Sequence, residues 1–279
     1  MRELDKEIVV STISRLCLEA NTNLPLDVAK AINHAKDNEV SACGRDVLTQ
    51  ISRNIDIARE QHMPLCQDTG AAVFFVELGR DVHLNFDLEE AINEGVRDGY
   101  TQGYLRKSMV RDPLKRVNTN DNTPAIIYLK SVAGEKLKVT FAPKGGGTEN
   151  MSTLKLLMPY AGEEAVKEFI IDTVKQAGPN PCPPVIVGVG IGGTFEKAAY
   201  LAKEALLRPF DIVHSDPYYA NMEQELLERI NALGIGPMGL GGRTTALRVL
   251  INVFPCHIAS LPVAVNMQCH CARHLEHEI

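Results

Sequence analysis

The sequence predicts an α+β fold, in which a helix-rich domain is built around a small mixed β-sheet. Before residue 62, apolar residues recur every three or four positions, which is the pattern of amphipathic helices. Residues 71–78 form a continuous apolar run, and residues 136–142 alternate between apolar and polar, as strands do. Later helices and strands follow no regular βαβ period, which favours a mixed sheet. At 279 residues the chain could form one large domain or two ordinary ones, and no linker decides between them; we expect residues 1–279 to form a single domain.

Each expected element rests on its periodicity and on the residues that end it. Asp87 is a good N-cap for a helix over residues 87–99, and Gly178 ends a helix over residues 163–176. Residues 125–130 and 136–142 are typical of a β-hairpin, because only a short polar stretch separates them. The other helices are expected at residues 3–19, 26–37, 194–207 and 220–233 and between Gly44 and Cys66, and the other strands at residues 71–78, 185–193 and 246–253. The glycines within residues 185–193 miss the G-x-G-x-x-G spacing, so we discount nucleotide binding.

The composition excludes two classes of partner. Hydrophobic residues make up 45% of the chain, but no apolar run approaches the ~20 residues of a membrane span, so no membrane partner is expected. The net charge of −6 and the aromatic content of 5% provide neither a basic groove nor a stacking platform for nucleic acid. The first ten residues are charged and lack the apolar core of a secretory signal, so the cytoplasm is the expected location.

One heptapeptide brings several chemically useful side chains together. Residues 64–70 have the sequence Pro-Leu-Cys-Gln-Asp-Thr-Gly, so a thiol, an amide, a carboxylate and a hydroxyl follow one another. The segment joins a predicted helix to a predicted strand, and such turns often hold polar groups that face a cleft. For the heptapeptide alone, an equally good interpretation is that Asp68 and Thr69 close the turn and that Cys66 is a small buried residue.

Two further loops have features of binding sites. Five basic residues lie within residues 106–116 of an otherwise acidic chain, which indicates a surface suited to carboxylate or phosphate, although a solvated basic loop is the commoner case. Residues 145–147 are three consecutive glycines, which let backbone N–H groups approach an anion. No Gly-Lys-Ser/Thr follows at the required spacing, so the loop is not a P-loop.

The cysteines favour free thiols or metal ligands over disulfides. Their number, seven, is odd, and the chain has a cytosolic character. Cys66, Cys182 and one of Cys269 and Cys271 lie on turns separated by roughly a hundred residues, whereas structural zinc sites usually have ligands paired two to four residues apart. This spacing suits an iron–sulfur cluster assembled by the fold. Four thiolates would complete a [4Fe–4S] cluster and three would leave one iron open as a Lewis acid; the spacing allows both.

Five motifs, in matching order over essentially the whole chain, resemble those of the class I, iron–sulfur fumarate hydratases and the related tartrate dehydratases. They are Cys66-Gln-Asp-Thr-Gly70, Lys144-Gly-Gly-Gly147, Pro181-Cys-Pro-Pro184, Gly239-Leu-Gly-Gly-Arg-Thr-Thr245 and His257-Ile-Ala-Ser-Leu-Pro-Val-Ala-Val-Asn-Met-Gln-Cys269. The resemblance implies the N-terminal domain of those enzymes. It also implies a [4Fe–4S] cluster held by Cys66, Cys182 and Cys269, with Cys271 as the rival of Cys269.

The same resemblance implies the residues that meet the substrate. Asp68 would be the acid–base group, unless it only hydrogen-bonds to Gln67 or to the backbone, and Arg106 would clamp a carboxylate through two parallel hydrogen bonds. The implied catalytic residues are Gln67, Asp68 and His257, the implied substrate-binding residues are Gln67, Asp68, Arg106 and Gly146, and Lys107, Arg243 and His274 are further candidates.

The expected reaction is the reversible hydration of fumarate to (S)-malate. The alternatives are the dehydration of L-tartrate or of another 2-hydroxy diacid and, from a different class, an iron–sulfur electron carrier, which would need a fourth ligand. The resembling enzymes have a smaller C-terminal region with further acid–base residues, which is absent here. We therefore expect an α subunit, a small dicarboxylate as its substrate, and a hetero-oligomer completed by a β subunit of about two hundred residues, the size of an ordinary domain.

Overall fold

The computed structural model describes residues 2–279, which form two compact units. Unit 1 contains the chain up to Pro25, Ile55–Gly146 and Arg273–Ile279, and unit 2 contains Leu26–Asn54 and Gly147–Ala272. Both units are discontinuous in sequence, and α3 (Ala42–Gln61) contributes to each of them. The expected single catalytic domain over residues 1–279 would have to include both units, and it stays a prediction.

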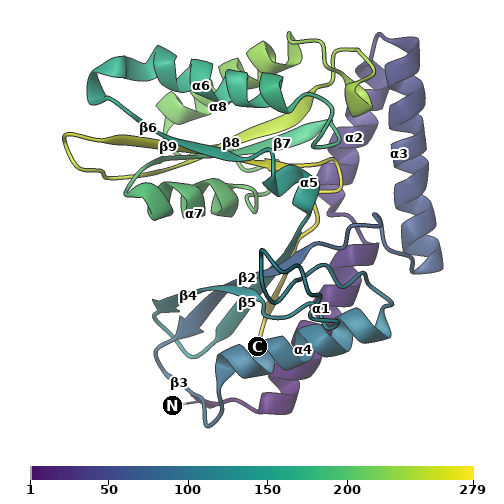
Figure 1. Ribbon diagram of the computed structural model, residues 1–279, viewed down its shortest axis with the longest axis vertical. Helices are drawn as coiled ribbons and strands as arrows, with labels where there is room; N and C mark the ends of the chain where they lie inside the picture. The colour runs from purple at the N-terminus through teal and green to yellow at the C-terminus, as the bar shows by residue number, and fades with distance from the viewer. Residues whose placement is uncertain (1) are drawn as a thin grey trace. The chain divides into compact units, whose positions relative to one another are not determined.

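Unit 1 is a four-stranded sheet with two helices packed against it. Its strand order is β10 (Leu275–Glu278), β5 (Leu137–Lys144), β2 (Ala71–Gly79), β4 (Ile126–Val132), and a short parallel pair, β1 (Arg2–Glu3) and β3 (Val82–His83), lies apart from this sheet. The helices α1 (Lys6–Thr22) and α4 (Leu88–Gln102) lie side by side (Figure 1) and share one apolar core with the strands. Their close approach depends on glycine, because a Cβ added at Gly95 would lie 2.5 Å from Ile13. As predicted, Asp87 caps α4, accepting a hydrogen bond from the Glu90 N–H.

The predicted hairpin of residues 125–130 and 136–142 is wrong. Both segments are strands, but β2 lies between them, parallel to β4 and antiparallel to β5. The physical reason is burial: β2 is apolar on both faces and takes an interior position in the sheet, whereas β4 is mostly exposed and takes the edge. The connecting turn pairs with the end of β2 instead, through the Gly79 N–H and the Lys136 carbonyl, 2.9 Å apart.

Unit 2 is a second four-stranded sheet with helices on both faces. Its strand order is β6 (Thr153–Leu157), β9 (Leu261–Gln268), β7 (Val185–Gly192), β8 (Ala246–Phe254), in which β7 and β8 are parallel. Figure 1 shows α6 (Gly162–Ala177) and α8 (Pro217–Asn231) over one face and α7 (Phe195–Ala205) under the other. The remaining helices are α2 (Leu26–Asn38), the single turn α5 (Gly146–Glu149) and the 3₁₀ turns η1 (Pro159–Ala161) and η2 (Pro237–Gly239).

The glycines of β7 serve helix packing. A Cβ at Gly188 or Gly190 would lie 2.1 Å from a backbone carbonyl oxygen of α7, that of Ala202 or Ala198. Glycine therefore lets the helix backbone rest directly on the strand, and this close approach accounts for both residues without a bound nucleotide.

The predicted α+β class is confirmed, with two four-stranded sheets in place of the single small sheet that was expected. Sequence patterns do not reveal how strands divide between sheets, because that division depends on long-range pairing. Within residues 2–279, no helix has both the length and the apolar character needed to cross a membrane.

Candidate active site

The loop between α3 and β2 is closed by Asp68. Its Oδ1 accepts a hydrogen bond from the Gly70 N–H at 3.0 Å, and its Oδ2 accepts one from the Gly146 N–H at 2.9 Å. The second bond joins the Cys66–Gly70 segment to the glycine loop, which the sequence separates by more than seventy residues. The Gly146 N–H, expected to approach a bound anion, thus holds a carboxylate of the protein itself.

Buried polar side chains hold the backbone of this loop in place. The Tyr100 hydroxyl donates to the Thr69 carbonyl at 2.8 Å, and the Asn122 amide donates to the Gly70 carbonyl at 3.1 Å. Arg273, only 3% exposed, donates from Nη2 to the Asp68 carbonyl at 2.8 Å and from Nη1 to the Asn21 side chain at 3.0 Å. Since buried polar groups specify a geometry only when they are paired, this network fixes the loop that carries Cys66.

Sequence patterns did not assign these supporting residues a role. Asn21 follows Cys17 by one helical turn on the buried face of α1, and Tyr100 lies on the buried face of α4. A polar residue at an apolar position of an amphipathic helix is the available signal that it serves a buried network. Asn122 lies in an irregular segment and has no such signal.

Gly70→Ala is expected to destabilise the protein by about 2 kcal/mol or more. Gly70 has φ +74°, a conformation that disfavours a side chain, and an added Cβ would lie 2.7 Å from the Lys144 backbone nitrogen. The measurement is the free energy of unfolding in denaturant. The matched control is Gly162→Ala, because Gly162 has φ +75° with nothing within 4 Å of the added Cβ. Equal losses in the two variants would contradict the role of the close contact.

Arg106 is tied to the same loop through its main chain. The Thr69 hydroxyl donates to the Arg106 carbonyl at 3.0 Å, and the Arg106 side chain itself is exposed. The Lys107 carbonyl accepts from the Asn118 amide at 2.9 Å, and His274 follows Arg273 directly in the chain. Unit 1 therefore brings together Cys66, Gln67, Asp68, Gly146 and the backbone of Arg106.

Unit 2 gathers three of the predicted motifs at one end of its sheet. The Val185 N–H donates to the Thr245 carbonyl at 2.9 Å, so β7 and β8 begin together. The Met238 N–H donates to the Pro183 carbonyl at 2.7 Å, and the Cys182 carbonyl accepts a hydrogen bond from Nδ1 of His270 at 2.9 Å. The Pro-Cys-Pro-Pro loop, the glycine-rich segment 234–245 and the segment after β9 are thus neighbours within the unit.

His257 lies away from that end. It is exposed in the turn between β8 and β9, where its Nδ1 accepts from the Ala259 N–H at 3.1 Å. The whole of β9 separates His257 from Cys269, about 25 Å at the rise of an extended strand. Within unit 2, therefore, His257 and the cysteines do not share a site.

The three predicted cluster ligands are thiols on irregular segments of two different units. All seven cysteines lie within residues 2–279, and none forms a disulfide. Cys66, Cys182 and Cys269 are half-buried on irregular segments. Cys182 has φ +55°, a backbone conformation that costs a non-glycine residue on the order of 1 kcal/mol. Cys66 belongs to unit 1 and the other two cysteines to unit 2, and the described residues bring no group of three or more His, Cys, Asp or Glu side chains close enough to hold a metal ion.

The predicted site residue Arg243 is held by a buried carboxylate. Glu39, 2% exposed, accepts from the N–H groups of Arg243 and Thr244 at 2.9 Å each and from that of Ser41 at 3.0 Å. Burial by itself would raise the pKa of Glu39, but these backbone hydrogen bonds outweigh it and lower the pKa to about 2. Glu39 is therefore charged at neutral pH and fixes the glycine-rich segment.

Glu39→Gln is expected to lose about 2 kcal/mol of stability at pH 7, because the amide cannot accept all three N–H hydrogen bonds. A folded-state pKa of about 2, below the ordinary value of 4.5, means that the carboxylate stabilises the fold above pH 4.5 and ceases to do so as the pH falls toward 2. The difference in unfolding free energy between wild type and Glu39→Gln should therefore shrink between these pH values. Glu60→Gln, at an exposed position of α3, is the control, and a pH-independent difference would contradict this role of Glu39.

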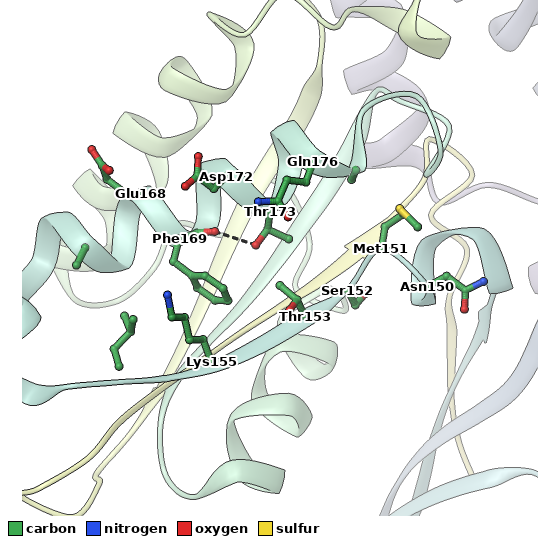
Figure 2. A pocket seen from close by; sticks show the side chains of 13 residues that line it. Asn150, Met151, Ser152, Thr153, Lys155, Glu168, Phe169, Asp172, Thr173 and Gln176 are labelled. Carbon is green, nitrogen blue, oxygen red and sulfur yellow. Dashed lines mark hydrogen bonds between the residues drawn. The ribbon is translucent and has the colours of Figure 1, made fainter.

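A cavity of 710 Å³ lies elsewhere in unit 2, between α6 and the edge strand β6. Figure 2 shows Lys155 of β6 directed toward Phe169 of α6, with its Nζ 5.9 Å from the ring centroid. Glu168 and Asp172 lie on the α6 side of the cavity. None of the residues predicted to bind substrate or metal lines this cavity.

Comparisons with known proteins agree on one family. The family model described as fumarate hydratase (fumerase) matches residues 10–278. A Methanocaldococcus jannaschii protein, provisionally named an L(+)-tartrate dehydratase subunit alpha, is 42% identical over 268 residues, which cover 94% of both chains. L(+)-tartrate dehydratase subunits alpha of Escherichia coli and Shigella sonnei are each 32% identical over 277 residues, covering 96% of this chain and 91% of theirs.

These matches define the protein as a hydro-lyase, which confirms the enzyme class expected from the motifs. The chain belongs to the fumarate hydratase (fumerase) family. The resemblance inferred from the five cysteine, glycine and histidine motifs is likewise confirmed.

Proposed function

We propose that the chain is the α subunit of an iron–sulfur hydro-lyase that interconverts fumarate and (S)-malate. The observation that carries this proposal is the double hydrogen bond of Asp68, to the N–H groups of Gly70 and Gly146. It joins the segment that carries the Cys66 thiol, the Gln67 amide and the Asp68 carboxylate to the exposed backbone of Gly146, and the main chain of Arg106 is bonded to the same segment. These are groups that a small dicarboxylate and a metal centre would require.

The cluster would be held by Cys66, Cys182 and Cys269. Their partial exposure on irregular segments supports this choice, whereas Cys271, the rival ligand, is 3% exposed. When bound, the cluster supplies an iron with an open coordination position, a Lewis acid toward the substrate hydroxyl. For these thiols to share one cluster, Cys66 of unit 1 must meet the two cysteines of unit 2.

The chain's own side chains would bind the substrate and move its proton. Arg106 would hold one carboxylate, since a guanidinium fixes both the charge and the angle of its partner. The exposed Gln67 amide would orient the hydroxyl-bearing carbon. Asp68 would take the proton from the carbon next to a carboxylate, because each of its oxygens keeps a second lone pair after accepting one N–H hydrogen bond. His257 stays a predicted catalytic residue for which unit 2 offers no supporting contact.

Arg106→Lys should lower kcat/KM by about 30-fold to a thousandfold, on the order of 2 to 4 kcal/mol, because lysine cannot make the bidentate contact. The iron content of the purified protein should not change. Steady-state kinetics on malate give the measurement.

Arg111→Lys is the matched control for this variant, because Arg111 is exposed in the same basic loop. It should keep the wild-type rate. If Arg106→Lys also kept that rate, Arg106 would belong to the solvated surface of the loop.

The second candidate substrate is L-tartrate. It is favoured by the names of the three relatives, all L(+)-tartrate dehydratase subunits alpha, and it requires the same chemistry on a diacid with one more hydroxyl. An anaerobic assay of the reconstituted enzyme on malate, fumarate and L-tartrate tests the choice. A kcat/KM for tartrate well above that for malate would replace fumarate hydration as the proposed activity.

The relatives' names also support a partner chain, because each calls its protein a subunit alpha. We therefore propose a hetero-oligomer with a separate β subunit, of about the size of an ordinary domain. The cytoplasmic location expected from the sequence stays a prediction.

A further inference from the structure

A second candidate binding site lies in unit 2, in a groove of 530 Å³ between α2 and α8. One wall is a single face of α2, on which Ala31, His34 and Ala35 are spaced by three and four residues. The opposite wall comes from α8 and includes Leu227 and Glu228, and Arg243 closes the groove. This volume is within the range that small-molecule sites occupy, roughly 300 to 1,000 Å³.

The position of Arg243 is fixed while its guanidinium remains available. Both carboxylate oxygens of Glu39 are taken up by backbone N–H groups, those of Arg243 and Thr244 among them. The buried charge of Glu39 thus orients the segment without neutralising the guanidinium. The Arg243 side chain is exposed, and the ion pairs of residues 2–279 do not include it.

The lining gives the groove a distinct chemistry. Its accessible surface is mostly apolar, contributed in part by Ala31, Ala35 and Leu227, and the cationic group stands at one side. Glu228 already accepts a hydrogen bond from the Gln224 amide at 2.8 Å. A guanidinium group next to an apolar surface is complementary to a carboxylate that carries a short hydrocarbon chain. The carboxylate of Glu228 would also accept a hydrogen bond from an ammonium group on the same ligand.

We propose that the groove between α2 and α8 binds a small organic carboxylate through Arg243. The ligand's carboxylate accepts from the guanidinium, and its hydrocarbon part lies against Ala31, Ala35 and Leu227. Arg243, a further candidate for substrate binding in the sequence analysis, is assigned here to a separate ligand, because no cysteine lines the groove and neither do Asp68 and Arg106.

The test is direct binding to the full chain, measured by calorimetry with three probes of equal length: hexanoate, its 2-amino analogue norleucine, and hexylamine. Hexanoate is expected to bind, and hexylamine, which lacks the carboxylate, is not. Arg243→Gln should weaken hexanoate binding about tenfold or more, as the loss of a charge-assisted contact does, while Arg80→Gln, at an exposed position of unit 1, should not. Norleucine binding more tightly than hexanoate would identify an amino acid as the ligand class.

Methyl NMR locates the ligand independently of the arginine variant. The Ala31 and Leu227 methyl signals should shift when hexanoate is added. Ala31→Leu, which fills the groove from the α2 wall, should abolish binding while the protein stays folded. Absence of hexanoate binding to wild type at millimolar concentration would overturn the proposal. So would equal affinity in Arg243→Gln, or displacement of hexanoate by malate at the stoichiometry of one shared site.

Discussion

Replacing Cys66, Cys182 or Cys269 by serine is expected to remove the iron–sulfur centre and to lower kcat by on the order of a thousandfold or more. Serine keeps the size of the side chain but does not provide the thiolate that iron binds in such centres. The measurements are iron content, visible absorption and turnover of the anaerobically reconstituted protein. Each variant should lose all three together, because the cluster and the Lewis acid are the same group.

Cys43→Ser and Cys256→Ser are the matched controls, since both thiols are exposed and lie outside the motifs. They should retain the iron and the activity. Cys271→Ser decides between the neighbouring candidates after β9. If that variant lost the cluster and Cys269→Ser kept it, the assignment of Cys269 would be wrong.

The full chain without its partner is expected to turn over malate about a hundredfold or more slowly than the complex. A dicarboxylate has two ends and the reaction needs a matched acid and base, but the predicted site residues of unit 1 include one exposed arginine, Arg106, and one carboxylate, that of Asp68. A partner surface would also remove water from the substrate's charges and so strengthen these contacts.

Titration of the reconstituted chain with the candidate β subunit, followed by fumarate absorbance, measures this dependence. An unrelated protein of similar size is the control and should have no effect. Light scattering on the same samples should show the mass of a hetero-oligomer. The complete rate from the chain alone would place all the chemistry within these 279 residues and contradict the proposed division between subunits.

Local signals predicted most of the helices and the ends of several of them. The Asp87 cap, the stop at Gly178 and the turn from Cys66 to Gly70 were all predicted correctly, because each depends on residues that are close in sequence. The strands β2, β4, β5, β7 and β8 were also predicted, but β6, β9, β10 and the order of the strands were not. The apparent hairpin failed because the burial of β2, which is decided by the whole core, outweighs the short connection between β4 and β5.

For the candidate site, too, the sequence and the tertiary structure determined different features. The sequence by itself determined the family and which side chains carry chemistry, since thiols, carboxylates and guanidinium groups in motifs are visible without coordinates. Only the tertiary structure decided that the Asp68 carboxylate accepts a hydrogen bond from the Gly146 N–H and that Arg273 donates one to the Asp68 carbonyl. It also decided that β9 separates His257 from Cys269. Such facts depend on which segments pack together, and distance along the sequence is a poor guide to them. The eight extended residues of β9 keep His257 away from Cys269, whereas one hydrogen bond joins Asp68 to Gly146, more than seventy residues further along the chain.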